Sequence, residues 1–480
     1  MKSPRERVVG REDELHAVAA FLDQKSATPA ALVIEGEAGI GKTTIVRSAV
    51  AEASSRGLRV FLARPGEGEV ELPYAGLGDL LAPVCADALA ALPGPQRAAV
   101  EAALVRTPSD GAIDRHAVSR GTLEVLRVEG AGGDLVVVVD DVQWLDRPTA
   151  AALTFALRRL GQLPVRILVA ARTDDGPSAL PLGLADWEAL RRLSVGPLST
   201  TELGALLKQH LGLQFSRPHV AAIRQLSGGN PMFALELARQ EAAHGVSSPT
   251  TTLPRALQLR LEALDPDTRR AVTIAAAALR PSADLLLRTG VTHAELRAAR
   301  DAEILELAEE RVSFVHPLLG AAAYDLLLPD QRREIHARLA AASSDAIERG
   351  HHVARSTVAR DDSVVGTLDR AAAEASALGD HAGAAAFLLR AVELSREPEG
   401  EAVNWRESTS RGGARAGRRR RGCRCSCAEA DRAATCRGRA GAGQADTRHL
   451  LPWLGDIVRG RPCRACSGAR RRPRRRHGEG

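Results

Sequence analysis

Long apolar runs, aromatic residues and cysteines are all scarce in this chain of 480 residues. No stretch of 18 or more apolar residues occurs, which excludes a membrane-spanning helix, and the first residues lack the apolar core of a signal peptide. Aromatic residues make up 3% of the chain, so its cores must be built mainly from Ala, Leu and Val. Residues 1–400 hold a single cysteine, which agrees with a reducing compartment. We therefore expect a soluble cytoplasmic protein.

Positive charge is concentrated at one end of the chain. Residues 401–480 hold 21 of the 65 basic residues and 7 of the 59 acidic residues. The net charge is therefore about +14 in this segment and about −8 over residues 1–400, against +6 for the whole chain. Six of the seven cysteines also lie in residues 401–480. The last 80 residues thus differ in kind from the main body.

Strands alternate with helices over the first 200 residues. Such alternation is typical of a parallel sheet with helices on both faces, which binds its ligand beyond the carboxyl ends of the strands. We predict an α/β domain with a parallel five-stranded sheet for residues 1–198. Apolar runs bounded by turn residues place the strands, at Ala31–Glu35, Leu58–Ala63, Leu135–Val139, Val165–Ala171 and Arg192–Val195.

Helices dominate after residue 198. A brief strand-like segment at Arg311–Val315 interrupts them and suits a small winged-helix module. Val364–Leu378 and His381–Leu394 form a helix pair that could begin a helical repeat. The predicted divisions are a helical lid at 199–250, a winged-helix-like domain at 251–345, a short helical-repeat (TPR-like) segment at 346–400 and an Arg/Cys-rich disordered tail at 401–480.

The octapeptide Gly36-Glu-Ala-Gly-Ile-Gly-Lys-Thr43 fits the pattern G-x-x-x-x-G-K-[ST] between a predicted strand and a predicted helix. Its glycines let backbone N–H groups turn inward onto phosphate oxygens, and the helix N-terminus adds its dipole. Lys42 is expected to reach the β and γ phosphates of ATP, and Thr43 to bind Mg²⁺. The predicted nucleotide-binding residues of this P-loop are Gly36, Glu37, Ala38, Gly39, Ile40, Gly41, Lys42, Thr43 and Thr44.

Two aspartates follow the strand Leu135–Val139 directly. A carboxylate at the end of a buried strand needs a cation nearby, and Mg²⁺ would be that cation. We assign Asp140 to the metal, together with Thr43, and Asp141 to polarising the attacking water. The alternative is an ordinary acidic turn at a strand end.

Arg172 follows the fourth predicted strand. In P-loop sheets of this class that strand lies between the P-loop strand and the strand that carries the metal-binding aspartate, so its end faces the γ-phosphate. We therefore predict three catalytic residues for hydrolysis: Lys42, Asp141 and Arg172. A solvated arginine at a strand end is the alternative for Arg172.

Several short motifs together resemble those of the STAND/AAA-type P-loop ATPases, which act in signalling. The resemblance covers about residues 6–395 and is closest to the bacterial LuxR-type large ATP-binding transcriptional regulators. The motifs occur in the same order, as Val8-Val-Gly-Arg-Glu-Asp-Glu-Leu15, the P-loop, Val138-Val-Asp-Asp-Val-Gln-Trp-Leu-Asp146, Gly196-Pro-Leu-Ser199, Ser227-Gly-Gly-Asn-Pro231 and Phe314-Val-His-Pro-Leu318.

The resemblance implies further nucleotide contacts. Val9 and Arg11 would line the nucleotide pocket, Pro231 would pack against the adenine, and His316 would contact the phosphates and hold a closed state. Each has a structural alternative: a helix-entry charge for Arg11, a helix start for Pro231 and a purely structural histidine for His316.

The resemblance also implies a slow switch that regulates transcription and hydrolyses ATP to ADP and phosphate. ADP would hold the module closed, while an unknown inducer or protein signal and exchange for ATP would open it and favour self-association. Regulators of this class are similar in ending with a long helical-repeat sensor and a helix-turn-helix. Neither is predicted here beyond the helix pair, so we do not expect DNA binding through this chain.

Residues 401–480 allow three interpretations. The cysteines from Cys423 to Cys466 could form a zinc site, although their spacing differs from paired CxxC units. The arginine runs could form a nucleic-acid-binding arm. We favour the third interpretation, an out-of-frame translation of a GC-rich gene after about residue 404. The low hydrophobicity and like charge of this segment predict disorder.

Two other functions remain open. One is a turnover AAA-type ATPase such as a loader or remodeller, which needs an arginine finger from a neighbouring subunit; Arg158 and Arg159 could supply it. The other is nucleic-acid binding through the basic tail.

Overall fold

The structure, a computed structural model, describes residues 8–24, 28–84, 86–104, 113–133, 135–173, 181–244, 252–308 and 311–396. The described residues all belong to one compact unit, Met1–Trp405. The zinc, basic-arm, frameshift and disorder interpretations of residues 401–480 all lie outside the described residues. Among the described residues, no helix combines the length and the apolar character that crossing a membrane requires.

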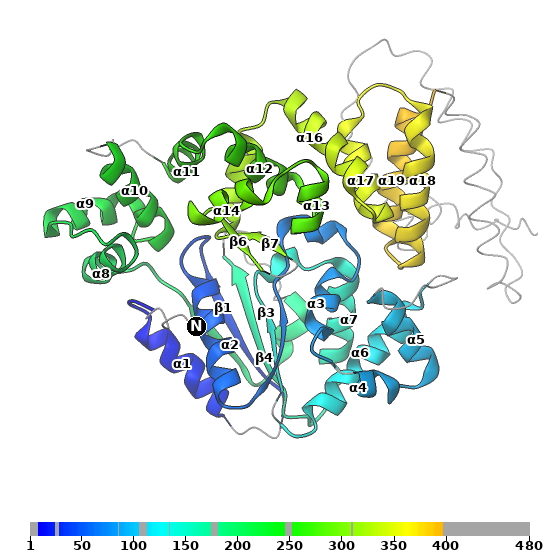
Figure 1. Cartoon of the computed structure of the whole chain (residues 1–480). Helices are drawn as coiled ribbons and strands as arrows, with labels where there is room; N and C mark the ends of the chain where they lie inside the picture. The colour runs from blue at the N-terminus through cyan, green and yellow to red at the C-terminus, as the bar shows by residue number, and fades with distance from the viewer. Residues whose placement is uncertain are drawn as a thin grey trace, which may run out of the picture. The chain divides into compact units, whose positions relative to one another are not determined.

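A five-stranded sheet forms the centre of the first 200 residues, with strand order β2-β3-β4-β1-β5 (Figure 1). Every neighbouring pair of strands is parallel, which confirms the predicted fold. The edge strand β5 begins two residues earlier than expected. The strands are β1 (Ala30–Gly36), β2 (Arg59–Ala63), β3 (Leu135–Val139), β4 (Arg166–Arg172) and β5 (Leu190–Ser194).

Helices cover both faces of this sheet. Alternate residues of β3 point to opposite faces, so Val137 and Val139 join one core while Val136 and Val138 join the other. The first face packs against α3 (Ala75–Leu81), α4 (Ala86–Ala90), α5 (Gly94–Ala103), α6 (Arg115–Gly130) and α7 (Arg147–Leu157). The second face packs against α1 (Glu12–Asp23) and α2 (Lys42–Ser55). All five residues of β3 are buried because it lies inside the sheet between these layers.

Asp146 caps helix α7, as its position before Pro148 predicts. Its buried carboxylate accepts from Thr149 N at 2.9 Å, Tyr74 N at 2.8 Å and Gly76 N at 3.0 Å. One side chain therefore starts α7 and ties it to α3. Three short 3₁₀ turns complete the domain, η1 (Glu67–Glu71), η2 (Val142–Trp144) and η3 (Pro181–Asp186).

The sheet is followed by α8 (Thr200–Leu211), α9 (Arg217–Ser227) and α10 (Pro231–His244), which correspond to the predicted lid and which we call the lid. They share a small apolar core that includes Leu203, Leu207, Ile223 and Leu237. The first lid helix starts with a capping box of Ser199 and Glu202.

The next module, which we call the wing domain, has its own core. Its strands β6 (Leu305–Leu307) and β7 (Val312–Phe314) pair in an antiparallel hairpin. The strand-like segment expected at Arg311–Val315 corresponds to β7, whereas β6 was not anticipated. The helices are α11 (Leu253–Glu262), α12 (Pro266–Ala277), α13 (Ala283–Arg288), α14 (His293–Asp301), α15 (Pro317–Asp325) and α16 (Pro329–Ala342).

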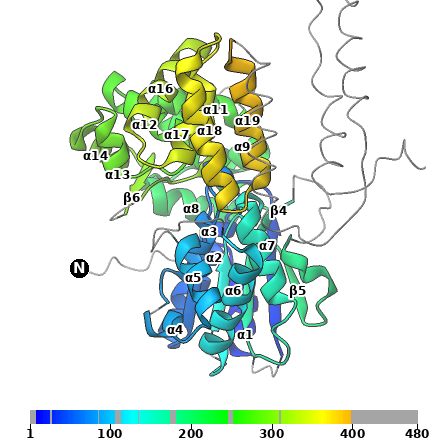
Figure 2. The same ribbon diagram turned by 90° about the vertical axis from the view of Figure 1, so that its right-hand side faces the viewer.

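The last described helices are α17 (Ala346–Ser356), α18 (Asp362–Ala377) and α19 (His381–Leu394). They lie side by side (Figure 1 and Figure 2). The helix pair read from the sequence is α18 and α19, and α17 packs against α18 and precedes the pair as a third helix.

Candidate functional site

The P-loop leaves the carboxyl end of β1 and enters α2 at Lys42. Gly39 and Gly41 have φ angles of +78° and +108°, which side chains with a Cβ rarely adopt. A Cβ on Gly36 would lie 2.9 Å from Ile40 Cγ2, so this position also requires glycine. The three glycines allow the chain to fold back tightly between strand and helix.

Lys42 lies inside this loop and is 6% exposed. Its Nζ donates to Gly36 O and to Glu37 O, both at 2.8 Å. A phosphate group held by the loop would lie beside this ammonium group, and hydrogen bonds between two charged groups are among the strongest in proteins. The geometry therefore fits an anion at the N-terminus of α2.

Asp140 lies opposite, at the end of β3, and is 4% exposed. Its Oδ1 accepts from Thr43 Oγ1 at 3.5 Å and from Asp141 N at 3.1 Å. Burial first, and then the charge of Asp141, raise the pKa of Asp140 to about 6. A bound divalent cation would stabilise the charged carboxylate. A buried carboxylate beside a hydroxyl is a donor set that suits Mg²⁺.

No group of three or more His, Cys, Asp or Glu side chains able to hold a metal occurs in the described part of the chain. A nucleotide-bound Mg²⁺ takes one or two protein ligands and completes its shell with phosphates and water. Thr43 and Asp140 are therefore the protein ligands that fit such an ion.

Asp141 has a left-handed backbone conformation, with φ +47°. Its carboxylate accepts from Gln143 Nε2 at 2.8 Å and lies 3.8 Å from Arg172 Nε. The Arg172 guanidinium also stacks over the Trp144 ring, 4.3 Å from its centroid. Arg172 is thus held between a carboxylate and an indole, at the end of a strand that separates β1 from β3 as expected.

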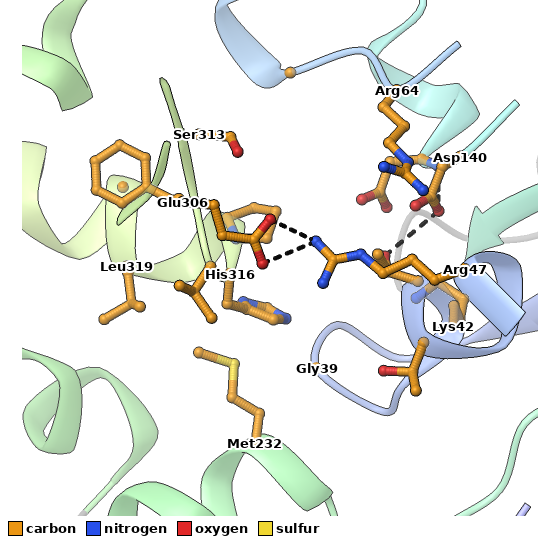
Figure 3. A pocket seen from close by; sticks show the side chains of 18 of the residues that line it. Gly39, Lys42, Arg47, Arg64, Asp140, Met232, Glu306, Ser313, His316 and Leu319 are labelled. Carbon is orange, nitrogen blue, oxygen red and sulfur yellow. Dashed lines mark hydrogen bonds and ion pairs between the residues drawn. The ribbon is translucent and has the colours of Figure 1, made fainter. Parts of the chain in front are cut away.

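The wing domain supplies the opposite wall of the site. His316 caps α15, and its Nδ1 accepts from Leu318 N at 3.1 Å. The neutral ring therefore carries its proton on Nε2. Burial, followed by the charges of Arg172 and Lys42, lowers the pKa of His316 to about 3. The ring points toward the P-loop (Figure 3), so it offers a neutral N–H donor on the phosphate side.

The lid covers the remaining side. Arg11, 5% exposed, donates to Ile40 O at 2.8 Å and to Glu14 Oε1 at 2.9 Å. Arg11 therefore holds the P-loop in place through the carbonyl oxygen of Ile40. Pro231 is the first residue of α10. Met232 beside it lies against Gly39, where a Cβ would be 3.3 Å from Met232 Sδ, and its side chain runs toward His316 (Figure 3). Val9 packs against the lid core.

These elements surround one cleft of about 2200 Å³. It collects sequence-predicted residues that lie up to 307 positions apart, from Val9 to His316. Gly36 and Glu37 do not line it, because Gly36 ends β1 and Glu37 faces a smaller cavity beside α10. The predicted residues that do are Val9, Arg11, Ala38, Gly39, Ile40, Gly41, Lys42, Thr43, Thr44, Asp140, Asp141, Arg172, Pro231 and His316.

The cleft also contains charged residues that sequence reasoning missed. Arg47 of α2 donates to both carboxylate oxygens of Glu306 in the wing domain, at 2.8 and 3.0 Å (Figure 3). Arg64 follows β2 and points toward Asp140 (Figure 3). The rule that ligands bind at carboxyl ends of strands could have identified Arg64, whereas no local signal joins Arg47 to Glu306.

A cluster of four charged residues links the wing domain to the sheet domain. Arg311 pairs with Glu69 and with Asp79, the latter at 2.8 Å, and also donates to Arg64 O at 3.0 Å. Arg280 pairs with Asp79 at 2.6 Å and lies 3.2 Å from Glu69. Glu69 is 3% exposed, and burial raises the pKa of its carboxyl despite the two arginines. We call these residues the interdomain clamp.

Residues 7–169 match the family model of the AAA ATPase domain. The match contains the P-loop and both aspartates that follow β3, so the chain carries an AAA-type ATPase domain. An uncharacterised protein of Rhizobium meliloti (strain 1021) is 26% identical over 396 residues, covering 69% of this chain and 36% of that protein. The chain therefore spans about a third of the length of this curated relative.

A solved structure supports the fold beyond that domain. A STAND protein with a tetratricopeptide-repeat sensor from Pyrococcus horikoshii aligns with TM-score 0.51 and 15% identity, over 83% of this chain and 59% of its own. At this identity the similarity concerns the fold alone. A Walker-type ATPase of Pyrococcus abyssi aligns over 67% of this chain and 97% of its own with 16% identity and TM-score 0.34, too low to establish a shared fold.

Proposed function

We propose that this chain is an ATP-binding signalling switch that hydrolyses ATP slowly and regulates transcription, as a LuxR-type large ATP-binding regulator does. The observation that carries the proposal is the position of His316: a wing-domain side chain faces the P-loop across the phosphate side of the cleft (Figure 3). A nucleotide there would contact the sheet domain, the lid and the wing domain together. Whether the bound nucleotide is ATP or ADP could then determine how the three modules pack against one another.

The roles of the residues follow from where they lie. The P-loop amides and Lys42 would hold the β and γ phosphates, and Pro231 with Met232 would cover the base. Thr43 and Asp140 would bind Mg²⁺, which when present neutralises charge on the phosphates. Asp141 would orient the attacking water.

The position of Arg172 would make ATP hydrolysis slow. In the present arrangement it lies 3.8 Å from Asp141 and stacks on Trp144. A guanidinium beside this carboxylate competes with water for its oxygens. Arg172 would have to move toward the γ-phosphate before Asp141 can act, so hydrolysis would depend on a conformational step.

We further propose that ADP favours the closed arrangement, in which His316 donates to a phosphate oxygen. An inducer or protein signal, with ATP in place of ADP, would open the wing domain and allow self-association. The protein would act in the cytoplasm.

The test is nucleotide binding and turnover by the purified chain, with K42A as the matched variant. The wild type should retain nucleotide and turn over ATP more slowly than about 1 s⁻¹, the lower end of ordinary enzymes. K42A should lose binding while its far-UV circular dichroism and thermal transition stay near those of the wild type.

Normal ATP binding by K42A would refute the P-loop assignment. Fast turnover by an ATP-dependent ring would instead favour the loader or remodeller class over the switch.

A further inference from the structure

Asn230 joins the lid to the P-loop through a single side chain. Its Nδ2 donates to Ala38 O at 2.9 Å, across 192 positions of sequence. Its Oδ1 accepts from Met232 N at 3.1 Å and Phe233 N at 3.3 Å, at the start of α10. Only one orientation of the carboxamide satisfies all three bonds, since the carbonyl needs a donor and the two amides need an acceptor.

The contact lies on the loop that would hold the phosphates. When P-loop amides turn inward toward an anion, the carbonyls of the same peptides point outward, and Ala38 O points to the lid. The fit is close, because a Cβ on Gly39 would lie 3.1 Å from Asn230 Oδ1 and 3.1 Å from Met232 Cβ. The loop therefore cannot rearrange at Ala38 and Gly39 without moving the N-terminus of α10.

The turn before Asn230 is fixed independently of any ligand. Gly229 O accepts from Leu198 N at 2.9 Å, and Gly229 N donates to the buried Ser227 Oγ at 3.2 Å. A Cβ on Gly229 would lie 2.8 Å from Leu198 O, so the turn is packed directly against the segment that leads into the lid. The carboxamide is thus held on a rigid support.

We propose that Asn230 is a positioning residue that couples the P-loop to the lid, so that nucleotide binding in the loop and closure of α10 stabilise each other. This inference rests on the nucleotide binding proposed above and adds the residue that transmits it. By linkage, nucleotide binding in the loop favours closure of the lid by the same factor by which lid closure raises the affinity for nucleotide. We expect this gain in affinity mainly as slower release of the nucleotide. The next residue, Pro231, is thereby held over the base.

Two substitutions separate this role from helix capping. N230D keeps an oxygen that caps α10, since Asp and Asn are comparable caps, but removes the Nδ2–H donor and places a carboxylate beside Ala38 O. N230A removes both functions. S199A serves as the control, because it removes the cap of another lid helix, where Ser199 Oγ accepts from Glu202 N at 3.3 Å, and leaves the P-loop contact intact.

The readouts are the release rate of N-methylanthraniloyl-ADP in stopped flow and the denaturant midpoint of the nucleotide-free protein. A hydrogen bond of ordinary net strength corresponds to a change of about two- to thirteenfold. We expect release to be about five- to tenfold faster in N230D and in N230A, and unchanged in S199A. The midpoint should fall less in N230D, which loses the bond to Ala38 O but keeps the cap, than in N230A, which loses both, and it should also fall in S199A.

A pH profile adds a readout that capping alone would not change. The carboxyl introduced by N230D becomes an O–H donor when protonated, which for an aspartate happens around pH 4. The ratio of its release rate to that of the wild type should therefore fall as the pH decreases from about 6 to about 4. Wild-type release from N230D at pH 8, or release from S199A as fast as from N230D, would overturn the inference. If the wild type binds no nucleotide at all, the proposed function fails together with it.

Discussion

The interdomain clamp offers a quantitative test of how the wing domain is held. Arg311 pairs with Glu69, which is 3% exposed, and with Asp79, and it also donates to Arg64 O. Removing one partner of a buried ion pair costs about 3–5 kcal/mol. Arg280 still lies 3.2 Å from Glu69, and the Arg311 side chain is 29% exposed. We therefore expect R311M to weaken the contact by about 2–3 kcal/mol.

Hydrogen exchange measures this cost directly. If the wing domain opens as a unit, loss of about 2–3 kcal/mol should speed exchange of the β6 and β7 amides by about 30- to 150-fold. Strands β1, β3 and β4 should keep the protection of the wild type. The matched control is R297M, the same replacement at an exposed position on α14.

A double-mutant cycle tests the assignment to Glu69. E69Q keeps an oxygen for the 2.7 Å bond from Gly66 N but removes the charge that Arg311 meets. The double variant should lower the free energy of opening of the wing domain by less than the sum of the two single variants, with a difference of about 1–2 kcal/mol. Additive effects, or wild-type exchange in R311M, would refute the reasoning.

Three further substitutions probe the site. The carboxyl of Asp140 has a pKa of about 6, above its ordinary value of 3.8, so the folded state takes up a proton between these values and the buried charge costs stability above pH 6. D140N should therefore raise the denaturant midpoint at pH 8 but not at pH 4, and it should abolish the effect of Mg²⁺ on ATP affinity; an equal midpoint at pH 8 would contradict this. H316A should release ADP several-fold faster in stopped flow without a change in far-UV circular dichroism, and release at the wild-type rate would remove His316 from the phosphate side. W144L should free Arg172 from its stacking partner and alter single-turnover hydrolysis more than ATP affinity, a split that equilibrium titration and quench-flow would resolve.

Contiguous residues carried much of what could be predicted. Leu135–Val139 is a run of five apolar residues, four of them β-branched valines. Such a run can bury all its side chains only inside a sheet that is covered on both faces, and all five residues are buried there. The glycines of Gly36–Thr43 meet backbone requirements that lie within eight residues of sequence. The prediction was poorer for short or polar strands. Strand β6 has three residues, too few to show an alternation of apolar and polar side chains, and β5 contains two exposed arginines.

Contacts between the modules could not be predicted in the same way. Arg47 and Glu306 are separated by 259 positions, and Asn230 and Ala38 by 192. Within its own segment, none of these residues belongs to a hydrophobic repeat or a motif that would indicate which distant residue it contacts. The roles assigned to Val9, Arg11, Pro231 and His316 rest on family resemblance and stay predictions, although the fold brings all four to one cleft.

The sequence by itself determined the sheet, the P-loop and the pair of aspartates, because hydrophobic period and backbone conformation are local properties that neighbouring residues encode. Only the tertiary structure decided that a wing-domain histidine points toward the P-loop (Figure 3), that Asn230 donates to the P-loop carbonyl of Ala38, and that two arginines pair with Glu69 and Asp79. These contacts depend on how separately folded layers pack, and packing follows from the shapes and charges of whole surfaces.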